Sequence, residues 1–196
     1  MHVNYHPQVA MIAIGASAGG IEAVTKLLRA LPAGFRIPVA VVIHLPPNRP
    51  SLLPELFARH CALPVREAQD KEPLAPGTVY IAPPDYHLMV EPGGLLSLSC
   101  DAPLHFSRPS LDMLFESAAM AYRDKLLAIL LTGASADGAD GLATVRQLGG
   151  QAWVQDPDEA QASIMPLAGI NRSGADKVLR LDGMAALLPG LYGAHE

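Results

Sequence analysis

The sequence contains few cysteines and few charged residues, and both shortages exclude whole classes of protein. Its two cysteines, Cys61 and Cys100, have neither the spacing of a zinc site nor that of a disulfide framework. Charged residues make up 17% of the chain and the formal net charge is −5, which argues against the basic face of a nucleic-acid-binding protein. No apolar run has the length of a membrane span, and no secretory signal pattern stands at the start. We therefore expect a cytoplasmic protein with no nucleic-acid partner and no membrane insertion.

The rest of the composition is that of a folded globular protein. Hydrophobic residues make up 50% of the 196 residues, which is enough for a sizeable core. The chain contains no internal repeat and no low-complexity segment, and its proline-rich patches at residues 46–50 and 73–84 predict loops. We expect a single domain over residues 1–196.

Strand-like runs alternate with helical patterns along the chain. Continuous apolar runs predict buried strands at residues 9–15, 39–45, 78–83, 125–133, 151–156 and 174–181. Apolar residues at helical spacing predict helices at residues 19–32, 51–61, 110–122, 140–150 and 182–192. Pro92-Gly93-Gly94 separates two apolar arms in residues 87–100, which is a hairpin signal. The expected fold is α/β: a doubly wound, mostly parallel sheet with helices on both faces and one antiparallel hairpin.

Three polar side chains stand where predicted strands end. Ser17 follows the first strand, His44 lies at the end of the second, and Asp137 comes after the most apolar strand, in LTGASADGADG. Ligands of open parallel sheets bind beyond the carboxyl ends of the strands, so these side chains belong to one edge. A serine hydroxyl needs an imidazole to take its proton, and the imidazole needs a carboxylate to orient it. The pattern therefore favours a catalytic Ser17, His44 and Asp137.

Simpler structural roles compete for each of these residues taken alone. Ser17 is also a favoured N-cap for the helix that follows it, and Asp137 and Asp140 are equally good caps for the helix predicted at residues 140–150. A single histidine at a strand end, such as His44, is often bonded only to backbone. Surface or loop positions are expected for the other histidines before the C-terminal tail, namely His2, His6, His60, His87 and His105.

A phosphate-binding loop is the alternative interpretation of GASAGG. Its glycines, at positions 15, 19 and 20, do not have the G-x-G-x-x-G spacing, and no Lys-Ser or Lys-Thr pair follows. Gly15, Ser17 and Gly19 do match the G-x-S-x-G elbow of common hydrolases, although that fold places its histidine last in the chain and His44 comes early. We therefore expect neither a dinucleotide nor any other cofactor, and no metal.

Several stretches, in one order, resemble the chemotaxis receptor protein-glutamate methylesterases, the CheB catalytic domain. They are IGASAGG, VVIHLPPNRPSLLPELFARHCALPV, GTVYIAPPDYHLMVE, SRPSLDMLFESAA, LLTGASADGADGL and VQDPDEAQASIMPLAGI. The resemblance covers nearly the whole chain. It implies a doubly wound α/β domain that hydrolyses glutamate methyl esters on chemoreceptor helices, releases methanol, and deamidates certain glutamines.

The resemblance also implies roles for individual residues. By motif, the serine, histidine and aspartate of the family's triad fall on Ser17, His44 and Asp137, so Asp137 is preferred over Asp140. Oxyanion or substrate-binding positions fall on Ala18, Ala134 and Met165. The implied partners are the cytoplasmic domains of methylated chemoreceptors and a separate receiver-domain protein.

The chain departs from the family pattern in three places. Ala18 stands where a threonine is usual, and the loop Thr132-Gly133-Ala134-Ser135 stands where T-G-M-G is usual. About eight residues precede the first predicted strand, so we expect a stand-alone form without the receiver domain of the best-known members. The competing hypotheses are a related esterase with another substrate and a non-catalytic module that binds receptors.

Overall fold

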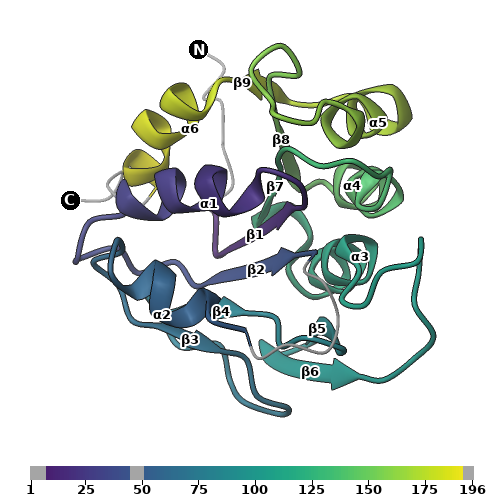
Figure 1. Ribbon diagram of the computed structural model, residues 1–196. Coiled ribbons are helices and arrows are strands. Elements are labelled where there is room, and N and C mark those ends of the chain that lie inside the picture. Colours follow the sequence, from purple (N-terminus) through teal and green to yellow (C-terminus); the bar gives the residue numbers. More distant parts are fainter. Residues whose placement is uncertain (1–7, 45–50, 192–196) are drawn as a thin grey trace, which may run out of the picture.

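A single parallel sheet organises the fold. Residues 8–44 and 51–191 are described here from a computed structural model (Figure 1). Seven parallel strands form the sheet in the order β3-β4-β2-β1-β7-β8-β9. They are β1 (Met11–Ala16), β2 (Val39–Ile43), β3 (Val65–Glu67), β4 (Val79–Ile81), β7 (Leu126–Leu130), β8 (Gln151–Gln155) and β9 (Lys177–Leu179). Two further strands, β5 (His87–Glu91) and β6 (Leu95–Ser99), form an antiparallel hairpin. The predicted α/β class and the hairpin are confirmed.

Helices cover both faces of the sheet. Figure 1 shows α1, α2 and α6 on one side and α3, α4 and α5 on the other. Their bounds are α1 (Gly20–Arg29), α2 (Leu53–Ala58), α3 (Leu111–Tyr122), α4 (Ala139–Gln147), α5 (Ile164–Ser173) and α6 (Leu181–Leu187), with short 3₁₀ turns η1 (Arg123–Lys125) and η2 (Leu188–Leu191). None of the helices in these residue ranges combines the length and the apolar character needed to cross a membrane.

Alternation along β1 assigns side chains to two hydrophobic cores. Ile12 and Ile14 pack into the core under α1, α2 and α6, whereas Met11 and Ala13 pack into the core under α3 and α4. Because side chains of a strand alternate between faces, a strand covered on both faces must be apolar throughout. Burial on both faces therefore explains why the strands appear in the sequence as continuous apolar runs.

The topology brings the first two candidate residues to one point of the sheet edge. Strand β1 lies between β2 and β7, so the strand order reverses at β1, and ligands of such sheets bind beside that reversal. Ala16 of β1 and Ile43 of β2 are directly paired in register. The next residues, Ser17 and His44, therefore leave the sheet side by side. The amide N–H of His44 donates to the Ala16 carbonyl over 3.1 Å and extends the pairing.

Some elements and positions differ from the predictions. The sequence patterns missed α5 and β3, and the surface or loop position expected for His87 is wrong. His87 lies on β5 with none of its surface exposed. Its Nδ1 accepts the Ser110 N–H over 3.1 Å and its Nε2 donates to the Ala102 carbonyl over 3.1 Å, so the buried ring has both nitrogens paired. The predicted loop at 46–50, His2, His6 and His195 lie outside the described residues.

Gly141 allows α3 and α4 to pack closely, and Gly141→Ala is expected to destabilise the protein. A Cβ at Gly141 would lie 2.8 Å from Phe115 Cβ and 3.0 Å from the Asp112 backbone. Overpacking of this kind costs about 1–3 kcal/mol of unfolding free energy. Gly183→Ala in α6 is the matched control, because its new Cβ would lie at an ordinary contact distance of 3.8 Å from Leu179. This substitution should stabilise the protein by about 0.5–1 kcal/mol, the cost of a glycine within a helix. Urea unfolding of both variants measures the difference. Equal stability in the two variants would contradict the packing argument.

Candidate active site

His44 and Asp137 form a direct contact at the carboxyl edge of the sheet. His44 Nε2 and Asp137 Oδ2 lie 2.7 Å apart, although the residues are 93 positions apart in the chain. The Asp137 side chain is fully buried, whereas 12% of the His44 side chain is exposed. The carboxylate accepts, so the Nε2 of His44 carries the hydrogen and its Nδ1 is left with a lone pair.

Asp137 also caps the N-terminus of helix α3. Its Oδ2 accepts the N–H of Leu111 over 2.7 Å, and its Oδ1 accepts the N–H of Asp112 over 3.1 Å and the hydroxyl of Ser110 over 2.8 Å. The first N–H groups of a helix have no partner within the helix and attract negative charge. The aspartate therefore caps a helix, but the helix is α3 and not α4, which follows it in sequence. Helix α4 has Gly138 at its N-cap.

The pKa of Asp137 is lowered by its hydrogen bonds. Burial acts to raise the pKa of this carboxyl, but the bonds from His44, Leu111, Ser110 and Asp112 together outweigh burial. Each of these donors stabilises the ionised form. Asp137 is therefore a fixed negative charge beside the imidazole, which stabilises a positively charged ring.

Asp112 is the second buried carboxyl of this region, and its pKa moves in the opposite direction. Burial and the negative charge of Asp137 raise the pKa of Asp112 to about 6, against the lowering effects of the Gly141 N–H and His105. Asp112 Oδ1 accepts the Gly141 N–H in the first turn of α4 over 2.7 Å. Each carboxyl thus binds the first turn of a helix to which it does not belong.

Ser17 faces the same cavity as His44. Ser17, Ile21, Ile43 and His44 are among the residues that line a cavity of about 370 Å³ at the start of α1. Ser17 is half-buried, and Gly19, with a φ of 77°, is the N-cap of α1. Ser17 is therefore not the residue that caps the helix. Its backbone is held from below, because the Ser17 N–H donates to the Thr132 carbonyl over 2.9 Å.

Thr132 stabilises the turn that carries Ser17 through hydrogen bonds, a role that the sequence patterns did not reveal. Its hydroxyl donates to the Ala18 carbonyl over 2.8 Å and accepts the Ala162 N–H over 2.9 Å. Its backbone N–H donates over 2.9 Å to the side chain of Gln155, which is almost fully buried. The turn after β1 is thereby tied to the segments that follow β7 and β8.

The chain matches one protein family along most of its length. The profile of the CheB methylesterase family matches residues 12–188. The chain belongs to the CheB methylesterase family. The crystal structure of the Thermotoga maritima CheB methylesterase catalytic domain superposes with a TM-score of 0.85 at 32% identity, covering 94% of this chain and 97% of that one.

Two relatives differ in how much of their length this CheB-family chain covers. A Leptospira interrogans protein provisionally named protein-glutamate methylesterase/protein-glutamine glutaminase is 42% identical, over 90% of this chain and 91% of its own length. The protein-glutamate methylesterase/protein-glutamine glutaminase 1 of Saccharophagus degradans is 45% identical over 89% of this chain, but only 48% of its own length. The chain thus corresponds to nearly all of one relative and about half of the other.

The remaining predicted site residues of this CheB-family chain are Ala18, Ala134 and Met165. Ala18 and Ala134 are exposed, and no described residue accepts a hydrogen bond from the backbone N–H of either one. Met165 is fully buried, and its sulfur would lie 2.5 Å from a Cβ placed on Gly133. Met165 therefore packs against the loop after β7, and the oxyanion role predicted for Ala18 and Ala134 stays a prediction.

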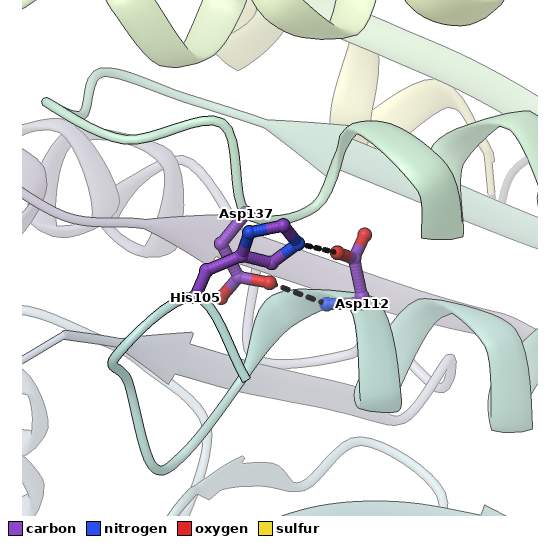
Figure 2. A group of neighbouring side chains, drawn as sticks. All are labelled: His105, Asp112 and Asp137. Carbon is purple, nitrogen blue, oxygen red and sulfur yellow. Dashed lines mark hydrogen bonds and ion pairs between the residues drawn. The ribbon is translucent and has the colours of Figure 1, made fainter. Parts of the chain in front are cut away.

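A possible ligand set for a metal ion also lies near Asp137. His105, Asp112 and Asp137 each offer an atom within 4.8 Å of the others. Figure 2 shows the His105 ring directed at Asp112, and the Asp112 N–H directed at the Asp137 carboxylate. Each oxygen of Asp137 already accepts two hydrogen bonds from the protein. An ion would have to displace either the donors at the start of α3 or the His44 ring from Asp137, so the residues present do not fit a metal.

A second hydroxyl lies on the free side of the imidazole. Ser107 Oγ is 3.5 Å from His44 Nδ1, at the outer limit of a hydrogen bond. A second cavity, of about 200 Å³, is lined by His44 together with Asp85, Phe106 and Ser107. His44 thus lines two cavities, one together with Ser17 and one together with Ser107.

The raised pKa of Asp112 predicts how stability depends on pH. The folded state binds a proton at Asp112 with a pKa of about 6, against an ordinary value of 3.8, so this contribution is complete below about pH 4 and is lost as the pH rises through 6. Asp112→Asn keeps an oxygen for the Gly141 N–H but cannot titrate. The stability of the wild type relative to Asp112→Asn should therefore fall by ~2–3 kcal/mol between pH 4 and pH 7. Urea unfolding across that range measures it, and parallel profiles for the two proteins would refute it.

Proposed function

We propose that this chain hydrolyses γ-methyl esters of glutamate on the cytoplasmic domains of chemoreceptors and releases methanol. The observation that carries the proposal is the His44–Asp137 contact, which orients the imidazole of His44, and His44 lines one cavity together with Ser17. An oriented imidazole beside a serine at a strand end has the composition of an acyl-transfer site. The names of the family relatives supply the substrate class.

In the first half-reaction, Ser17 Oγ attacks the ester carbonyl carbon while His44 Nδ1 takes the hydroxyl proton. The charge of Asp137 stabilises the imidazolium that forms. The N–H groups of Ala18 and Ala134, which have no acceptor among the described residues, are the proposed donors to the oxyanion, and one such donor is typically worth about 3 kcal/mol of barrier. The carbon–oxygen bond to the methoxy group then breaks, and His44 returns its proton to give methanol and an acyl-serine.

In the second half-reaction, water replaces methanol. His44 Nδ1 takes a proton from a water molecule that attacks the acyl-serine, and the same nitrogen returns the proton to Ser17 Oγ. The products are the glutamate carboxylate and the free enzyme. A glutamine side chain enters the same sequence with ammonia as the leaving group, so we propose deamidation as a second activity of this site.

Ser17→Ala is expected to abolish methanol release while leaving the fold intact. The change removes one oxygen from a half-buried position in a turn that is held by backbone bonds, so the core is not disturbed. Methanol released from methylated receptor fragments measures activity, and thermal unfolding checks the fold. A variant that retains a substantial part of the wild-type rate would show that the nucleophile is another residue.

Asp137→Asn and Asp140→Asn are a matched pair with opposite expected outcomes. In Asp137→Asn, the side-chain NH2 group must face either the backbone N–H donors of α3 or the N–H of His44, and two donors cannot bond to each other. The rate should therefore fall about 10⁴-fold, and the melting temperature should also fall. Asp140 is exposed and pairs with Arg172, so its substitution should cost less than about 1 kcal/mol and leave the rate nearly unchanged. Methanol release by the two purified variants decides, and equal losses would contradict the assignment of Asp137.

A further inference from the structure

A tight turn beside His44 has a backbone conformation that is unfavourable for its residues. Leu104 and Ser107 exchange two backbone hydrogen bonds, of 3.1 and 2.8 Å. The two residues between them, His105 and Phe106, have φ values of 48° and 61°. Glycine, asparagine and aspartate are favoured in such turns, because other side chains crowd the backbone at positive φ. Residues 104–107, which we call the 104–107 turn, therefore keep two bulky residues in a conformation that costs them free energy.

The 104–107 turn is fixed to the site at several points. His105 Nε2 lies 3.3 Å from Asp112 Oδ2, a pair that Figure 2 shows, and Ser107 Oγ lies 3.5 Å from His44 Nδ1. Just beyond the turn, Arg108 Nη1 donates to the carbonyls of Cys100 and Asp101 over 3.0 and 3.2 Å. These contacts hold the tip of the turn at a defined place relative to the imidazole.

Phe106, at the tip, is fully exposed. Its relative exposure is 104%, the highest among the exposed large hydrophobic residues in the described part of the chain. An exposed aromatic ring in a fixed and unfavourable turn gives the isolated chain no burial of apolar surface. Aromatic side chains held in this way are, however, effective anchors for binding, because little conformational freedom is lost when a partner covers them.

The position of Phe106 indicates which partner covers it. Phe106 lines the cavity on one side of His44, and Ile21, with 40% of its surface exposed, lines the Ser17 cavity on the other side. A glutamyl ester reaches Ser17 through a short side chain, so the polypeptide that carries it lies at the rim of the Ser17 cavity. His44 lines both cavities, so a helix that crosses this rim toward the second cavity lies beside Phe106.

We propose that Phe106 is a substrate-binding residue that packs on apolar side chains of the receptor helix carrying the methyl ester. Contact with Phe106 selects esters carried by a folded polypeptide over the same ester in a small molecule. This inference rests on the proposed methylesterase function and adds a specificity-determining residue to it.

The test compares two substrates in one assay of methanol release. One substrate is a methylated receptor cytoplasmic fragment, and the other is N-acetyl-glutamate γ-methyl ester amide. In Phe106→Ala, the ratio of kcat/KM for the receptor fragment to kcat/KM for the small ester should fall on the order of tenfold, mainly through a higher KM for the fragment. Phe106→Leu should restore much of the ratio, because it keeps a large apolar side chain.

Met120→Ala is the matched control. Met120 is also a large apolar residue with 63% of its surface exposed, but it lies near the other end of α3 from Asp112. The ratio should be unchanged in Met120→Ala, and thermal unfolding checks that each variant is folded. A ratio that Phe106→Ala leaves at its wild-type value, or lowers no more than Met120→Ala does, overturns the inference and leaves the esterase standing. Wild-type protein that hydrolyses neither substrate, or only the small ester, overturns the proposed function and this inference with it.

Discussion

The carboxylate of Asp137 is the contact on which the carboxyl edge of the sheet depends. It binds the first N–H groups of α3, the Ser110 hydroxyl and the His44 ring at once. A buried carboxylate without partners and the unpaired start of a buried helix are each costly, and here each satisfies the other. The orientation of the imidazole is therefore coupled to the place where α3 begins, and a change at either one is transmitted to the other.

The two buried carboxyls of this edge have environments that move their pKa values apart. Asp137 receives four donors and its pKa is lowered, whereas burial and the nearby charge of Asp137 raise the pKa of Asp112 to about 6. Divergent pKa values in one site separate the roles of like groups. Asp137 stays charged beside the imidazole, while Asp112 is the group that takes up a proton first and thereby limits repulsion between them. Close packing of α3 and α4 at Gly141 keeps the pair together.

Local patterns in the sequence predicted the sheet edge well and its long-range contacts poorly. Ser17 and His44 could be placed because both stand where continuous apolar runs end. The capping role of Asp137 was predicted for the wrong helix, because its partner α3 lies earlier in the chain and only the tertiary fold brings them together.

Helix α5 was missed because Pro166 and Gly169 interrupt its apolar pattern, and β3 was missed because it has only three residues, all partly or largely exposed. Burial of His87 depends on partners at 102 and 110, to which no pattern around residue 87 points.

The contacts around the 104–107 turn connect Phe106, the proposed substrate-binding residue, to His44, the proposed proton-transfer residue. Asp137 holds Ser110 and the start of α3, and Asp112 in that first turn pairs with His105. The turn that presents Phe106 is thus positioned by the same carboxylate that orients His44. A polypeptide that packs on Phe106 is placed relative to the imidazole without relying on a flexible loop. Fixed placement of this kind lowers the entropic part of a barrier, because the reacting groups need not search for one another. The unfavourable backbone conformation of the 104–107 turn is consistent with that placing role, since only a rigid turn can fix the distance between Phe106 and His44.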